Sequence, residues 1–167
     1  MITNYQLNQL NPEIKKLLSL FIFVLTIGVG VGLIYLSTTA SSKFSGIEEH
    51  YNGSVVEDEF DIPVRYPKTI NNLLLTTHNH LLSLSLIFLS IGLIFSFNSI
   101  ISGKLKWFFI YEPFFSIIFT FGGIWGLRFI SSNFLWIIAI SGSLMYLIYF
   151  LMAIICMYEL LFKNPQS

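Results

Sequence analysis

The sequence predicts an all-α integral membrane protein, a four-helix bundle with one acidic extramembrane loop between its first and second spans. The 167 residues are 54% hydrophobic and only 11% charged, with a mean hydropathy of +0.74, whereas soluble domains carry roughly 25% charged residues. Four apolar stretches reach the length of about 20 residues that a helix needs to cross a bilayer. Because helices satisfy their own backbone groups in lipid, we expect one membrane domain over residues 1–167.

The first span is predicted over residues 12–37. Asn11 and Pro12 have the form of a helix start, with a capping side chain followed by proline at the first helical position. The apolar run exceeds the 7–15 residues or so of a signal peptide, which favours a retained anchor. Gly28 and Gly32 form a Gly-x-x-x-Gly pair, a pattern that packs helices in membranes.

The acidic loop follows, over about residues 38–71, and contains Glu48, Glu49, Glu57, Asp58, Glu59 and Asp61. One interpretation is a solvated acidic surface. The other is a surface that attracts a basic soluble partner by electrostatic steering. The net charge of the whole chain is zero, so the composition gives no indication of nucleic-acid binding.

The second span is predicted over residues 72–99 and contains two histidines near its start. Ionisable side chains in a spanning segment are rare and are candidates for function. A spacing of seven residues puts His78, Ser85 and Gly92 on one face of the helix, and small residues on such a face permit close packing. We therefore expect His78 to point into the bundle and His80, roughly opposite, to face lipid or a partner.

The third span is predicted over residues 107–130, with Ser116 and Gly123 on a further small-residue stripe. Pro113 favours a helix that begins at this proline, with Glu112 as its cap. In the alternative, the helix begins further upstream, and Glu112 lies inside the hydrocarbon and needs a partner or a proton.

The fourth span is predicted over residues 134–162. Short links join the last three spans, so these should pack as consecutive antiparallel neighbours. Cys156 is the single cysteine of the chain. It excludes an internal disulfide and any all-cysteine metal site within one chain, and we expect it to be a small core hydrophobe.

The distribution of basic residues predicts the orientation in the membrane. The side that holds both termini carries Lys15, Lys16, Lys104, Lys106 and Lys163, and the other side carries Lys43, Arg65, Lys68 and Arg128. The positive-inside rule therefore favours cytoplasmic termini. Frequent Ile, Asn and Phe are compatible with an AT-rich bacterial genome and hence with a bacterial inner membrane.

A haem b or copper site is one chemical alternative. His78 and His80 diverge on a regular helix, so a metal at either of them needs another ligand. His50, Met145 or His78 of a second protomer could supply it. Arg128 lies at the same depth and could hold a haem propionate, or it could extend towards the lipid headgroups.

Several short motifs resemble those of uncharacterised small four-span bacterial inner-membrane proteins whose second span starts with Thr-Thr-His-x-His. The resemblance covers most of residues 35–130 and implies no established activity. The motifs are Glu49-His50-Tyr51-Asn52-Gly53, Pro67-Lys68, Thr76-Thr77-His78-Asn79-His80, Glu112-Pro113-Phe114 and Trp125 to Phe129.

We expect a small subunit or an accessory or assembly factor of a membrane complex, with a respiratory complex among the candidates. The alternatives are a haem- or copper-binding electron-transfer protein that uses His78, and a proton or small-solute pathway. No hydrolase triad, phosphate-binding loop or redox Cys-x-x-Cys motif is present, so catalysis by this chain itself is not expected. The expected partners are the lipid bilayer and other membrane subunits or further copies of the chain, without nucleic acid.

Overall fold

Every regular element among residues 6–39, 44–54 and 62–163, which the computed structural model describes, is helical. Four of the helices are long and apolar enough to cross a membrane, so the predicted four-helix membrane bundle is confirmed. In chain order, the elements are η1 (Leu7–Gln9), α1 (Pro12–Thr39), α2 (Phe44–Asn52), α3 (Ile70–Ser96), α4 (Gly103–Phe129) and α5 (Phe134–Phe162).

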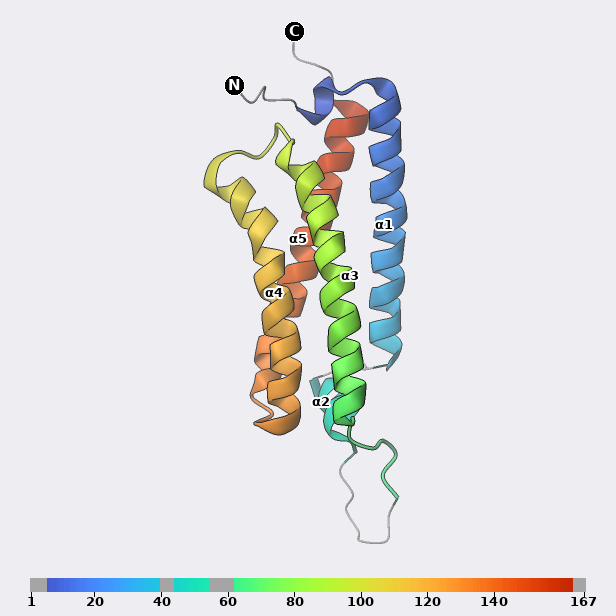
Figure 1. The fold of residues 1–167 in the computed structure, drawn as a ribbon, viewed down its shortest axis with the longest axis vertical. Helices are drawn as coiled ribbons and strands as arrows, with labels where there is room; N and C mark the ends of the chain where they lie inside the picture. Colours follow the sequence, from blue (N-terminus) through green and yellow to red (C-terminus); the bar gives the residue numbers. More distant parts are fainter. Residues whose placement is uncertain (1–5, 40–43, 55–61, 164–167) are drawn as a thin grey trace.

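The helices run alternately up and down, which gives the bundle two distinct ends (Figure 1). The η1 end holds η1, the start of α1, the α3–α4 loop and the end of α5. The α2 end holds α2, the end of α1, the start of α3 and the α4–α5 turn. The closest helix pair is α4 with α5, α3 packs on both of these helices, and α1 packs chiefly on α5.

Two of the predicted span boundaries differ from the helix ends in the structure by three or four residues. Helix α3 ends at Ser96 rather than 99, because the side chain of Asn98 accepts hydrogen bonds from the amides of Ile100 and Ile101 at 3.0 and 2.7 Å and turns the chain. Helix α4 starts at Gly103 rather than 107. Gly103 has a φ of +65°, a backbone conformation that glycine adopts without steric cost.

The core receives side chains from all four long helices. Ile22 of α1, Phe95 of α3, Ile117 of α4 and Tyr149 of α5 are each at most 1% exposed. The rings of Phe88 and Tyr149 meet edge to face with their centroids 6.0 Å apart, a favourable geometry for two aromatic rings. The apolar faces of the helices therefore meet in one continuous core.

Helices α4 and α5 approach each other closely beside two glycines. A Cβ atom added to Gly123 would lie 2.9 Å from a side-chain carbon of Ile138, and one added to Gly126 would overlap the ring of Phe134. Small residues allow helix backbones to approach in this way in membranes. The glycines at these two positions are therefore needed for the short α4–α5 separation.

Gly126→Ala should destabilise the bundle by about 1–3 kcal/mol, the usual cost of overpacking a well-packed site. The matched control is Gly122→Ala on the same helix, where an added Cβ has no atom within 4 Å. The control should leave stability unchanged or raise it, because alanine is the better helix former. Thermal unfolding of the purified protein in detergent measures both variants, and equal stability of the two would contradict this packing account.

Candidate functional site

The described residues between α1 and α3 (44–54 and 62–69) are hydrogen-bonded to one another and to the α2 end of the bundle. Within the segment, the Ser54 amide donates to the Arg65 carbonyl at 2.9 Å, and the Lys68 amide donates to the Tyr51 carbonyl at 3.0 Å. The Asn52 side chain donates to the carbonyl of Leu127 on α4 at 3.3 Å. The segment is thus folded onto the end of the α4–α5 pair.

Arg128 contributes a second fastening at this end. Its Nε donates to the Lys68 carbonyl at 3.2 Å, and its guanidinium carbon lies 5.2 Å from the ring centre of Phe129. The sequence predicted that Arg128 either holds an anion or extends to the headgroups. The structure shows this side chain joining the loop to α4, and an anion or the lipid headgroups at its guanidinium stay a prediction.

Only part of the predicted acidic surface lies among the described residues. Glu48 accepts a hydrogen bond from the Ser132 hydroxyl in the α4–α5 turn, and Glu49 accepts one from Ser54 at 2.7 Å. The other four acids, Glu57, Asp58, Glu59 and Asp61, lie outside the described residues. Docking of a basic soluble partner therefore stays a prediction.

One of the two histidines of α3 is placed differently from the prediction. His78 is exposed, contrary to the expectation that it would face the bundle interior. His80 is also exposed, yet its ring lies 5.2 Å from that of Phe121 on α4, and its Nδ1 lies 2.8 Å from the Thr76 carbonyl oxygen.

The bulky apolar residues of α3 explain the difference. Its buried positions are Leu73, Phe88, Ile91, Gly92 and Phe95, which form one stripe with helical spacing. Van der Waals packing of these side chains against the neighbouring helices sets the rotation of α3. Ser85 is half-buried at the edge of this stripe, and a Cβ added to Gly92 would lie 3.6 Å from Ile110 of α4.

The proposed metal ligands do not gather within this chain. No group of three or more His, Cys, Asp or Glu side chains that could hold a metal occurs among the residues that the structure describes. His50 lies in α2, and Met145 is 2% exposed in the core, whereas His78 faces outward. Haem b or copper at His78 stays a prediction.

His50 lies in a positively charged, half-buried environment. Burial is the largest cause that lowers the pKa of His50 below its ordinary value of 6.5, and the charges of Lys68 and Arg65 lower the pKa further. Folding of the loop therefore favours the neutral form of the His50 imidazole.

Glu112 is an interior residue of α4 and not the cap of a helix that begins at Pro113. Proline is favourable at the first position of a helix because no hydrogen bond is lost there. Inside a membrane helix, proline is also tolerated where neighbouring groups compensate for its missing N–H. Glu112 is 9% exposed. The Ser116 hydroxyl donates to its Oε1, while its buried Oε2 has no partner among the described residues.

Further polar contacts of α4 lie between Ser116 and the α2 end. The hydroxyls of Thr120 on α4 and Ser141 on α5 lie 2.7 Å apart. Near the start of α3, the Trp125 indole donates to the Thr77 hydroxyl at 3.0 Å. Hydroxyl and indole contacts thus join α4 to each of its two neighbouring helices, and hydrogen bonds of this kind hold helices together in membranes.

Sequence reasoning missed Glu159, the most buried acid of the described chain. Glu159 of α5 is fully buried, and its two carboxylate oxygens accept hydrogen bonds from the Ser99 amide at 2.8 Å and the Ser99 hydroxyl at 2.5 Å. Lys163 donates to the same hydroxyl at 2.6 Å, and Lys106 donates to the Asn98 carbonyl at 2.8 Å. The available signal was a lone acid in an apolar helix, four residues before a lysine.

Helix α1 makes few contacts with the rest of the bundle. Its buried residues are Ser19 and Ile22, and its Thr26 hydroxyl lies 3.2 Å from the Tyr149 hydroxyl of α5. A Cβ added at Gly28 or Gly32 would have no atom within 4 Å. The Gly-x-x-x-Gly pair was expected to pack helices, and it has no packing partner within the described chain.

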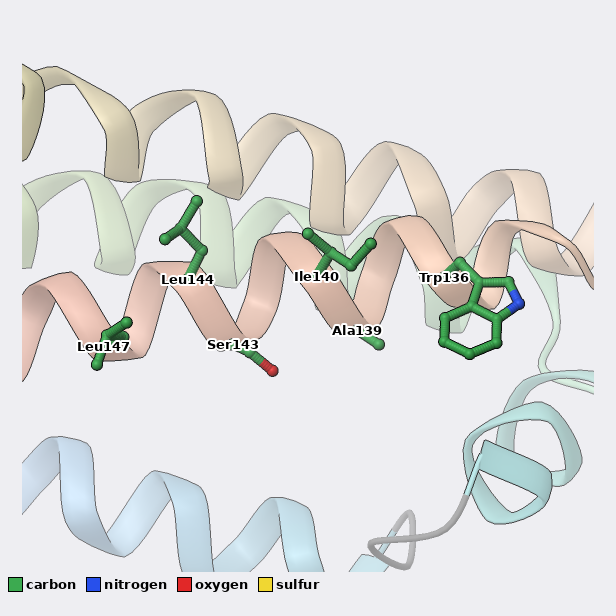
Figure 2. A pocket seen from close by; sticks show the side chains of 6 residues that line it. All are labelled: Trp136, Ala139, Ile140, Ser143, Leu144 and Leu147. Carbon is green, nitrogen blue, oxygen red and sulfur yellow. The ribbon is translucent and has the colours of Figure 1, made fainter.

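An apolar groove lies along α5 near the α2 end of the bundle. In Figure 2, Ala139 and Ser143 point from α5 towards the side on which α1 runs. The groove is lined by Trp136, Ala139, Ile140, Ser143, Leu144 and Leu147. In the half of the bundle nearest α2, the surface of α5 that faces α1 is therefore apolar and open. Helices α1 and α5 do not fill this space with side chains.

One family model matches most of the chain. It describes a transmembrane helical domain and covers residues 41–167, which include α2, α3, α4 and α5 and leave α1 outside. No curated protein and no solved structure matches the chain.

Replacement of Glu159 by leucine should destabilise the protein by about 1–3 kcal/mol, because the Ser99 amide and hydroxyl would be left without their acceptor. Glu13→Leu is the control, since Glu13 is exposed in the first turn of α1. Unfolding in a denaturing detergent compares the two variants. Equal stability of the two variants would show that the buried carboxylate does not hold the α3–α4 loop.

The α2 segment should loosen as the pH falls below about 6.5, the ordinary value for histidine. The folded pKa of His50 is lowered, so the unfolded segment binds a proton first, and the stability present above this pH is lost as the pH falls. Hydrogen exchange of the α2 amides measures the change. His50→Gln should remove the acid-dependent part, and an unchanged pH profile in this variant would exclude His50 as its cause.

Proposed function

This chain belongs to the Aq_1264_TM family of transmembrane helical domains, and we propose that it acts as a small subunit or accessory factor of a larger membrane complex. In this proposal, α1 is the helix that binds the complex, and the remaining helices form the supporting bundle. The partner is a transmembrane helix of another subunit or of a second copy. The observation that carries the proposal is the open glycine face of α1.

The glycines of α1 have no packing role within the chain. Gly28 and Gly32 lie about one turn apart on one face of the helix, and a Cβ added at either of them would have no atom within 4 Å. Glycine inside a helix costs roughly 0.5–1 kcal/mol relative to alanine. In membranes, this cost is offset where glycine lets another helix approach closely, which supports a partner helix at this face.

The α4–α5 pair shows how glycine behaves when a partner helix is present. Gly123 and Gly126 each lie so close to α5 that a single added carbon would be crowded. The same residue type therefore mediates close approach on α4 and leaves a free surface on α1. This contrast supports an external helix as the partner of α1.

The weak attachment of α1 points in the same direction. Among the four long helices, α1 buries the smallest share of its apolar window within the chain. It also precedes the region that the family model matches. An additional, loosely packed helix at the edge of a bundle is well placed to form an interface.

The orientation and location follow from the charge distribution. Lys15, Lys106 and Lys163 all bind groups at the η1 end. Cytoplasmic loops carry an excess of lysine and arginine, which supports an η1 end in the cytoplasm, and the residue usage noted above supports a bacterial inner membrane. The acidic loop would then be available on the outer side.

Gly28→Leu/Gly32→Leu should weaken association with the partner roughly tenfold or more, since a loss of about 1.4 kcal/mol corresponds to this factor. The control is Ile27→Leu/Ile34→Leu, two exposed positions of the same helix that lie about 100° or more around it from the glycines. Native-gel migration and co-purification in mild detergent measure association, and the amount of protein in the membrane is compared in parallel.

We expect the glycine variant to migrate as the free chain and the control to stay in the complex. A wild-type chain that migrates alone, with no co-purifying protein and no second copy, would contradict the subunit proposal. Retention of the complex by the glycine variant would contradict the role of this face.

A further inference from the structure

We propose that Glu112 is a reversible proton-binding site inside the membrane-spanning bundle and carries its carboxyl in the neutral form at neutral pH. This inference goes beyond the subunit role and does not depend on it. It rests on the depth of the residue, the unequal partners of its two oxygens, and the absence of a positive charge among its described contacts.

Glu112 lies inside the long apolar helix α4, well away from its polar η1 end. It is nine residues beyond the first residue of α4, which corresponds to about 14 Å along a helix. Lys106 marks the polar end of the helix through its bonds to the Ser96 and Asn98 carbonyls, and Glu112 lies about 9 Å further in. An unpaired ionised side chain at such a depth is costly.

The two oxygens of the Glu112 carboxyl have different surroundings. Oε1 accepts a hydrogen bond from the Ser116 hydroxyl. Oε2 is buried and has no partner among the described residues. A carboxylate needs donors at both oxygens, whereas a neutral acid needs one donor and, for its own O–H, one acceptor.

Pro113 makes such an acceptor available on the same helix. A proline has no N–H, so the carbonyl four residues before it, that of Phe109, lacks its usual helical donor. Phe109 is three residues before Glu112, a spacing that places the two on the same side of a helix. This carbonyl is the candidate acceptor for the O–H of a neutral Glu112 carboxyl.

Glu159 shows the arrangement of a buried acid that is fully provided with donors. Both of its oxygens accept hydrogen bonds from Ser99, and Lys163 binds the same Ser99 hydroxyl. Glu159 is also near the end of α5, three residues before Phe162. Glu112, by contrast, has one hydrogen-bond donor and no lysine near that donor, and it lies further from the end of its helix.

The titratable groups of the neighbouring helices give Glu112 no countercharge. The Thr120–Ser141 contact sets the antiparallel register of α4 and α5, so eight residues further along, Glu112 is level with Tyr149. The Tyr149 hydroxyl lies 3.2 Å from the Thr26 hydroxyl of α1. Cys156, further towards the η1 end of α5, is an uncharged thiol in the core.

The remaining elements around α4 also lack a charge at this level. After His80, which lies against Phe121 near the α2 end, α3 contains no titratable residue. Helix α2 lies at the opposite end of the bundle from the α3–α4 loop (Figure 1), so its charged residues are not level with Glu112. On α4 itself, the Tyr111 ring stacks on Trp107 at 5.6 Å and is exposed. A bound proton is thus the means by which Glu112 avoids an isolated charge.

Infrared spectroscopy of the protein in lipid bilayers tests the proposal, because the C=O stretch of a protonated carboxyl is distinct from the bands of a carboxylate. At neutral pH, the wild type should show a protonated-carboxyl band that is absent from Glu112→Gln and retained in Glu159→Gln. The band should fall at alkaline pH and return on neutralisation. Loss of a carboxylate band instead, or a protonated band that alkali does not change, would overturn the proposal.

Ser116→Ala keeps the test decisive if Glu112→Gln does not fold. This variant removes the hydroxyl that donates to Oε1 and leaves the carboxyl in place. The protonated-carboxyl band should then move to higher frequency without loss of intensity, because a carbonyl with a weaker hydrogen bond vibrates at higher frequency. A band that does not move would show that it does not belong to Glu112.

Discussion

The close approach of α4 and α5 is the constraint on which the remaining structure depends. Gly123 and Gly126 bring the two helices together over the half of the bundle nearest α2, and the Thr120–Ser141 hydroxyl pair fixes their register. Helices α3 and α1 then pack on the surface of this pair. In lipid there is little hydrophobic driving force between helices, so such close backbone packing is the source of stability that the sequence can provide.

The two ends of the α4–α5 pair are closed by different chemistry. At the α2 end, Asn52 and Arg128 join the loop to the bundle through single hydrogen bonds that involve backbone carbonyls. At the η1 end, the fully buried Glu159 organises the α3–α4 loop together with two lysines. Glu112 belongs to neither closure, and its Oε2 has no partner among the described residues.

The sequence predicted the number of spans well, because length and hydropathy determine them, and the bounds of α5 agree with those predicted for the fourth span. It did not predict the rotation of α3, because His78 lies on a small-residue stripe whose packing is outweighed by Phe88, Phe95 and their bulky neighbours. It also favoured the wrong start for α4, since a proline is compatible with both a helix start and a helix interior. The Glu159–Ser99 contact joins residues 60 positions apart, and no local pattern indicates such a pairing.

The central claim is that the glycine face of α1 binds another protein helix, and photo-crosslinking in native membranes tests it most directly. A photoreactive residue is placed at position 35, seven residues after Gly28 and therefore on the same side of the helix, or at position 34 on another side; Tyr35 and Ile34 are both exposed. Position 35 should give a discrete product with the mass of this chain plus a second protein, and position 34 should give lipid adducts. Lipid adducts alone at both positions would contradict the account.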